Sequence, residues 1–180
     1  MRQPMDQSVF AGWDNFYVML GSSAAALIGL LFVVVTLTAG YETAKASRGA
    51  TLFMTPTAID FAVVLATSAT ALAPSLPVCA IAAVLGGSSL VGGANAIQAF
   101  VGIRTRMPGA EPPHWSDAWL YGALPAALYL GLVAAAIALC AGAPGMPPAI
   151  AALLLALLLV GIRNAWDLVT WLAPRKKDAP

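Results

Sequence analysis

Long apolar runs without a charged residue dominate the pattern of the chain. The first covers residues 16–39, and at about 1.5 Å per helical residue it crosses a hydrocarbon core of roughly 30 Å with some tilt. The runs are continuous rather than alternating, which favours helices over the strands of a membrane barrel. Helices satisfy their own backbone polar groups, as lipid requires. The pattern predicts an all-α, polytopic transmembrane helical bundle with five spans, at about 16–39, 56–73, 78–101, 118–141 and 148–172.

Prolines separate the predicted spans. Thr55 and Pro56 are typical of an N-cap and first helical position, so they predict the start of the second span. The region 56–101 holds 46 residues, about twice what one crossing needs, and therefore predicts a hairpin. Pro125 lies inside the fourth span, where it predicts a kink whose freed carbonyl is satisfied by a neighbouring helix. The alternative is a four-span bundle with a re-entrant second helix.

Basic residues define the expected orientation. In the five-span arrangement only Arg2 falls on the N-terminal side, and the positive-inside rule then places the N-terminus outside and the C-terminus in the cytoplasm. A four-span arrangement divides the basic residues less sharply, six against two. The side opposite Arg2 carries Lys45, Arg48, Arg104, Arg106, Arg175, Lys176 and Lys177.

The ends of the chain differ from the spans. Residues 1–15 lead into the first span, with Val9, Phe10, Trp13, Phe16 and Tyr17 expected on one helical face at headgroup level. Residues 16–172 form the transmembrane helical domain, and residues 173–180 form a basic cytoplasmic tail. We expect no cleaved signal peptide, because the first apolar run is too long for one.

Composition agrees with this class and excludes others. Hydrophobic residues make up 60% of the chain, charged residues 9%, and the mean hydropathy is +0.83. Soluble domains carry roughly 25% charged residues, so a soluble fold is excluded. The net charge of +1 gives no basic face for nucleic acid.

Small residues recur at helical spacing in two spans. Such spacing lets helix backbones approach closely in lipid, and we interpret it as internal packing, with a homo-oligomer interface as the alternative. The positions are Gly21, Ala25 and Gly29 in the first span, and Ser88, Gly92, Ser89 and Gly93 in the third.

Polar residues inside the spans are expected to form one layer near the cytoplasmic face. Arg163 and Asp167 are four residues apart and can pair on one helix face. Because ionisable groups in lipid are expensive, we expect them to contact one another. The favoured interpretation is structural, and a proton or ion pathway is the alternative. The layer comprises Asp60, Asn95, Gln98, Arg163, Asn164 and Asp167, with Thr36 and Thr38 at the same depth.

No pattern indicates catalysis, a metal or a cofactor. Cys79 opens the third span and Cys140 closes the fourth, so both should lie near the outer face. A disulfide between them is possible only if their Cα atoms come within roughly 7 Å. Because both are flanked by apolar residues, we expect free, buried thiols. His114 lies in a predicted loop with no second metal ligand nearby. An enzyme is therefore the least supported class.

Two stretches resemble a group of small, uncharacterised bacterial multi-pass membrane proteins. The opening one is Trp13-Asp14-Asn15-Phe16-Tyr17 with Gly21 and the run 24–33, and the closing one is 161–167, Gly-Ile-Arg-Asn-Ala-Trp-Asp. The resemblance implies a bacterial inner-membrane protein and no mechanism. We expect a small non-enzymatic helper or interaction protein, in contact with the bilayer and with a membrane-protein partner or a second copy. The alternative is an oligomeric ion or proton channel or a small transporter.

Overall fold

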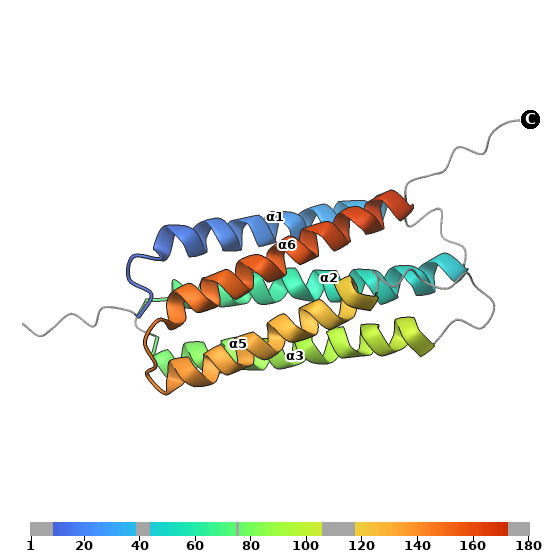
Figure 1. Ribbon diagram of the computed structural model, residues 1–180. Coiled ribbons are helices and arrows are strands. Elements are labelled where there is room, and N and C mark those ends of the chain that lie inside the picture. The colour runs from blue at the N-terminus through green and yellow to red at the C-terminus, as the bar shows by residue number, and fades with distance from the viewer. Residues whose placement is uncertain (1–8, 39–43, 75, 106–117, 173–180) are drawn as a thin grey trace, which may run out of the picture.

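The computed structural model describes residues 9–38, 44–74, 76–105 and 118–172 of the chain. Five long helices run side by side along one common direction (Figure 1). They are α1 (Asp14–Thr38), α2 (Ala44–Ala71), α3 (Val78–Thr105), a fourth helix that opens with the π-helical turn η1 (Trp119–Ala123) and continues as α5 (Leu124–Cys140), and α6 (Met146–Leu172).

All five helices are long and apolar enough to cross a membrane, which makes the chain a multi-pass membrane protein. The five-span prediction is confirmed. The four-span alternative is wrong, because the second helix is continuous over a segment of membrane-spanning length. The candidate spans are Asp14–Thr36, Met54–Ala71, Val78–Arg104, Trp119–Cys140 and Met146–Thr170.

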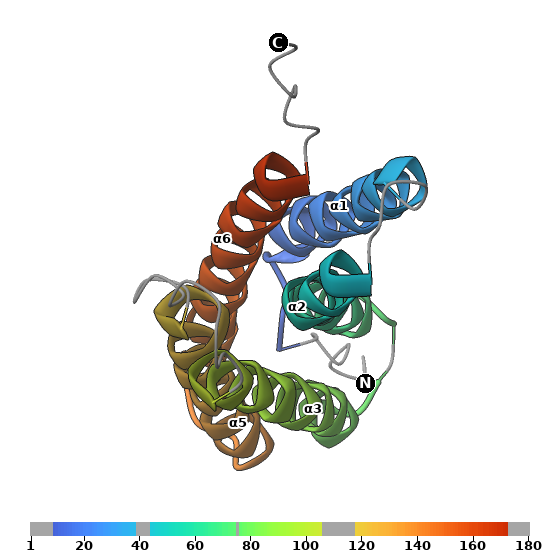
Figure 2. The same ribbon diagram turned by 90° about the vertical axis from the view of Figure 1, so that its right-hand side faces the viewer.

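Helix α2 contacts more of the long helices than α1 or α5 does. It packs against α1, α3 and α6, while α5 packs against α3 and α6 (Figure 2). One large apolar cluster joins these helices, with Tyr17, Phe61, Leu85, Tyr129 and Leu154 among its fully buried side chains. A smaller cluster of Ile103, Ala118 and Tyr121 joins the end of α3 to η1.

The start of α2 differs from the prediction. The helix begins at Ala44, and Pro56 lies inside it rather than at its first turn. The polar residues before Pro56 lower the local hydropathy, but hydropathy reports which part of a helix suits lipid and not where the helix begins. Pro56 is buried, and membrane bundles tolerate proline where neighbours surround it.

A π-helical turn, η1, comes directly before Pro125 in the fourth helix, where the sequence predicts a kink. The Leu124 N–H bonds to the Trp119 carbonyl, five residues back. The same pattern would direct the next N–H, that of residue 125, to the Leu120 carbonyl. Proline has no N–H. The Asn164 side-chain amide of α6 donates to the Leu120 carbonyl instead, at 2.9 Å.

The segment before α1 forms a turn rather than a helical face. Gly12 has φ +85°, a left-handed conformation that glycine adopts without steric cost. The turn folds Phe10 back until it is buried edge-to-face on Tyr17, with ring centroids 5.4 Å apart. The aromatic residues therefore pack on one another rather than lining one face of a helix. Residues 1–8, the tail 173–180 and His114 lie outside the described residues.

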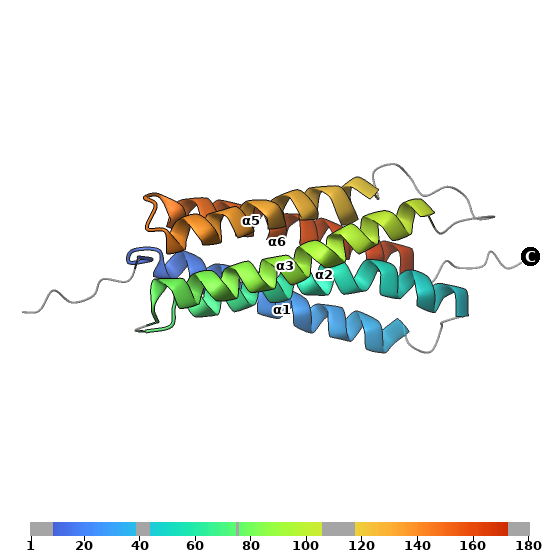
Figure 3. The same cartoon turned by 90° about the horizontal axis from the view of Figure 1, so that it is seen from below.

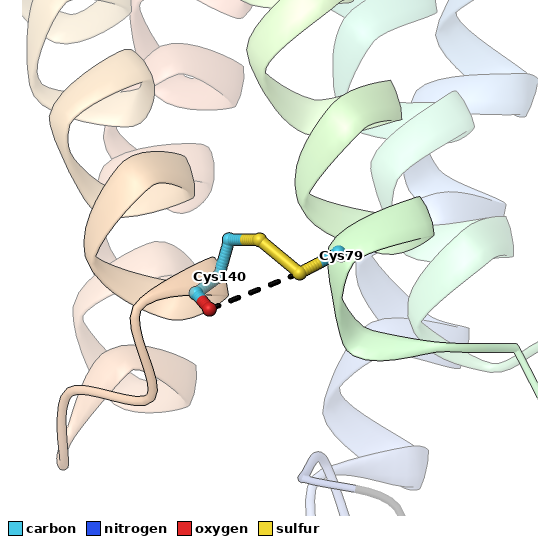
Figure 4. The surroundings of a disulfide bond; sticks show 2 residues. All are labelled: Cys79 and Cys140. Atoms are coloured by element: carbon cyan, nitrogen blue, oxygen red, sulfur yellow. Dashed lines mark hydrogen bonds between the residues drawn. A yellow bond between two sulfur atoms is a disulfide. The ribbon is translucent and has the colours of Figure 1, made fainter.

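The prediction for the cysteines is wrong. Cys79 and Cys140 form a disulfide, with Cα atoms 4.8 Å apart, and both residues are exposed (Figure 4). The Cys79 Sγ atom lies 3.8 Å from the Cys140 carbonyl oxygen but, once bonded to sulfur, has no proton to donate. Helices α3 and α5 run side by side (Figure 3), so the first turn of α3 meets the last residue of α5. Apolar neighbours in sequence misled the prediction, because adjacent helical residues such as Leu139 point to other faces.

Candidate intramembrane site

The buried face of α2 carries an unusual number of polar side chains. Thr57, Asp60, Thr67 and Ser68 are each at most 2% exposed. Thr57 is three residues before Asp60, and Thr67 and Ser68 are seven and eight residues after it, so all four lie on one side of the helix. Because α2 is enclosed by α1, α3 and α6, this polar side faces the interior of the bundle.

Asp60 is the charged residue of this face and is bound by a tyrosine of another helix. The Tyr129 hydroxyl of α5 donates a 2.6 Å hydrogen bond to Asp60 Oδ1. Both side chains are buried, at 2% and 1% exposure. A hydrogen bond from a neutral donor to a carboxylate is short and strong, and this one joins two helices that are distant in sequence.

The Asp60–Tyr129 pair lies well inside the membrane span. Asp60 is eleven residues before the end of α2 at Ala71, and Tyr129 is eleven residues before the end of α5 at Cys140. At the helical rise, each lies about 16 Å from that end of the bundle. Asp60 is also about 9 Å inside the Met54 end of its span. Asp60 lies sixteen residues after the start of α2 at Ala44, and not four residues after a start at Pro56 as the predicted bounds imply.

A glycine of α3 makes room for the tyrosine. A Cβ atom at Gly92 would overlap the Tyr129 ring and would lie 2.6 Å from its hydroxyl oxygen. A Cβ atom at the adjacent Gly93 would make an ordinary 3.4 Å contact with the Tyr129 Cβ. The ring thus rests directly on the backbone of α3 at Gly92, and this contact sets where the hydroxyl lies relative to Asp60.

Several buried polar atoms among the described residues have no hydrogen-bond partner. Leaving such a group unpaired costs about 1–3 kcal/mol. Helical Ser and Thr hydroxyls commonly bond a carbonyl of their own helix, as Thr70 does with the Ala66 carbonyl at 3.0 Å, but those of Thr67, Ser68 and Ser89 do not. The unpartnered atoms are Asp60 Oδ2, Thr67 Oγ1, Ser68 Oγ, Ser89 Oγ and Asn164 Oδ1.

A second polar group joins α6 to the fourth helix at residues 163–167 of α6 and at η1. Arg163 pairs with Asp167 across 3.7 Å, as their spacing predicts, and both side chains are about half exposed. The Tyr121 hydroxyl donates to the Asn164 backbone carbonyl at 2.9 Å. Asn164 is buried and donates to the Leu120 carbonyl. The hydrogen bonds of Tyr121 and Asn164 therefore hold α6 against the π-helical turn η1.

The predicted polar layer is divided rather than continuous. Among the described residues Asp60 bonds to Tyr129, whereas the Arg163 side chain is about half exposed and pairs with Asp167. Asn95 donates to the Val91 carbonyl of its own helix at 3.0 Å, and Gln98 is exposed. The sequence prediction that Asn95 and Gln98 join Asp60 and Arg163 is wrong. At the predicted depth, Thr36 donates to its own helix at Val33, and the Thr38 side chain lies outside the described set.

Some of the predicted small-residue positions lie at contacts between helices, and others are exposed. A Cβ atom at Gly21 would lie 3.0 Å from the Ser68 Cβ, so α1 and α2 approach closely there. Gly92 and Gly93 contact Tyr129, and Ser88 donates to the Leu85 carbonyl of its own helix. Ala25 and Gly29 are exposed, so they face away from the described helices and stay candidates for a contact with lipid or another chain.

Sequence reasoning missed Tyr129, the partner of Asp60. Its position in an apolar run carries no signal of its own, apart from the general rule that a buried tyrosine hydroxyl finds a hydrogen-bond partner. Comparison with known protein families, characterised proteins and solved structures gives no match for this chain. A functional argument therefore rests on the site itself.

Proposed function

We propose that this protein binds a small cation within the membrane and conducts or carries it across, with the Asp60 carboxylate as the binding group. The observation that carries the proposal is a buried carboxylate, about 16 Å from one end of the bundle, with one oxygen held by Tyr129 and the other unpartnered among the described residues. A buried carboxylate without a positive partner is costly. Ionisable residues inside a span commonly mark a pathway for ions or protons.

The other charged residues whose side chains the structure describes do not neutralise Asp60. Asp14 lies at the start of α1 and Arg104 near the end of α3, while Arg163 and Asp167 lie on α6 with side chains that are about half exposed. Arg104 lies over the Phe100 ring, 4.8 Å from its centroid, and Arg163 pairs with Asp167. A cation from solution is therefore the counter-charge that this site lacks.

We propose the bacterial cytoplasmic membrane as the location, with the N-terminus outside. Two independent features support this orientation. Basic residues concentrate beyond one end of the bundle, as the cytoplasmic side requires, and the Cys79–Cys140 disulfide lies at the opposite end, as an oxidising outer compartment requires. The bacterial origin is supported by the resemblance of the opening and closing segments.

Cation flux through the purified protein in liposomes tests the proposed function. Gradients of H⁺, Na⁺ and K⁺ are applied in turn, and entry is followed with an enclosed indicator dye. We expect the wild type to pass at least one of these cations and Asp60→Asn to abolish that flux. Asp14→Asn is the matched control, because it makes the same change at an exposed helix end; its flux is expected to stay at the wild-type level.

The alternative function, a small helper or interaction protein, is decided by the same measurement. It predicts a folded wild type that passes none of the three cations. That result would overturn the proposed transport function. The exposed Ala25 and Gly29 positions on α1 would then be the first place to seek a contact with a second copy or another membrane protein.

A further inference from the structure

We infer that the cation bound at this site is a proton, taken up on the Oδ2 atom of Asp60, and that Gly92 is a positioning residue for Tyr129 on the other oxygen. This inference rests on the proposed function, whose cation it identifies. Proton uptake forms one O–H bond on Oδ2 and cancels the carboxylate charge. The proton comes from a hydronium ion in the water on one side of the membrane, and the Tyr129 hydroxyl keeps its own proton.

The available ligands favour a proton over a metal ion. Hard cations are bound by about six oxygen atoms or more. Here one carboxylate oxygen already accepts from Tyr129, and the Tyr129 oxygen is directed at Asp60 as a donor. Among the described residues no group of three or more His, Cys, Asp or Glu side chains can hold a metal. A single free carboxylate oxygen is sufficient for a proton.

Few of the described acids and bases lie around Asp60, and the one that bonds to it is Tyr129. On α5 the titratable group facing it is Tyr129. Asp14 and Arg104 lie near helix ends, and Tyr17 bonds the Pro147 carbonyl near the disulfide end. Arg163 of α6 lies two residues from Gly161, which packs on Phe61, but its side chain is about half exposed and pairs with Asp167. On α2 itself the buried neighbours are the hydroxyls of Thr57 and Thr67. A change of protonation deep in the described bundle is therefore assigned to Asp60.

Gly92 determines how Tyr129 meets the carboxylate. Because a Cβ atom there would overlap the ring, Gly92→Ala must displace the hydroxyl without removing any titratable group. Gly93→Ala is the matched control, since the neighbouring position adds the same methyl group to the same helix with only ordinary contact. Both substitutions favour helix formation equally, so a difference between them reports the position of Tyr129.

Infrared difference spectroscopy of the protein in lipid, between high and low pH, tests the inference. A protonated carboxyl group gives a C=O stretching band that a carboxylate lacks. We expect this band in the wild type and its loss in Asp60→Asn. Tyr129→Phe and Gly92→Ala should shift the band, because they remove or displace the hydrogen bond to Oδ1, whereas Gly93→Ala should leave it unchanged. If Asp60→Asn does not fold, the shift in Tyr129→Phe identifies the band.

The outcomes separate this inference from the proposed function. Sodium or potassium flux that needs Asp60, without a carboxyl band, would overturn the proton assignment and leave cation transport standing. A band that needs Asp60, in a protein that passes no cation, would overturn transport and leave the proton site standing. Equal spectra for Gly92→Ala and Gly93→Ala would overturn the role of Gly92.

Discussion

The side-chain amide of Asn164 donates a hydrogen bond to the backbone carbonyl of Leu120 across 2.9 Å, at the point where Pro125 interrupts the fourth helix. We expect Asn164→Leu to destabilise the protein by about 1–2 kcal/mol, because it leaves the Leu120 carbonyl unpaired inside the bundle. Unfolding in mixed detergent measures this cost.

Pro125→Ala provides the control for that prediction. Alanine restores an N–H that the π-helical pattern directs at Leu120, so Asn164→Leu should cost less in the Pro125→Ala background. The difference is the coupling energy of a double-mutant cycle. Equal costs in the two backgrounds would show that Asn164 does not act through the carbonyl exposed by the proline.

The close approach of α2 and α6 at Gly161 gives a second prediction. A Cβ atom there would lie 2.6 Å from the Phe61 Cε1, and Phe61 is fully buried. Gly161→Ala should therefore lower stability by about 1–3 kcal/mol through overpacking. Gly29→Ala is the matched control, because nothing lies within 4 Å of that position. Similar thermal stability of the two variants in detergent would contradict the contact.

The number of helices was predictable because each apolar run matches the thickness of a bilayer. Their ends were less predictable, since α2 extends through residues whose hydropathy resembles a loop. Arg163 and Asp167 were paired correctly because both lie on one helix, where spacing determines distance. The partners Asp60 and Tyr129 lie on different helices, and their meeting depends on packing at Gly92 that a single sequence does not encode locally.

The same reasoning explains the error at the cysteines. Cys79 opens the third span and Cys140 closes the fourth, so the order of the spans placed both near one end of the bundle, which was correct. Whether two helix ends meet depends on which helices are neighbours, and α3 could have paired with several others. The disulfide follows from the packing of α3 on α5, and this packing became known only from the three-dimensional arrangement.

The disulfide leads to a third prediction, on stability. The bond closes a separation of 61 residues, and removing a cross-link of this kind costs about 2–4 kcal/mol. Cys79→Ser combined with Cys140→Ser should therefore unfold at a lower temperature than the oxidised wild type. The reduced wild type should resemble the double variant. A double variant as stable as the oxidised protein would show that α3 and α5 are held equally well without the bond.

The fourth prediction concerns orientation. With the basic residues in the cytoplasm and the disulfide outside, a reporter fused after Met5 should be active only outside and one fused at Pro180 only in the cytoplasm. In intact cells, a membrane-impermeant thiol reagent should label Cys79 and Cys140 after reduction with an impermeant reductant, because both residues are exposed at that end. The Cys79→Ser, Cys140→Ser variant controls for background, as these are the chain's two cysteines. Labelling that requires permeabilised cells, together with a cytoplasmic reporter after Met5, would invert the proposed topology. The disulfide would then face a reducing compartment, and the two features that support the orientation would no longer agree.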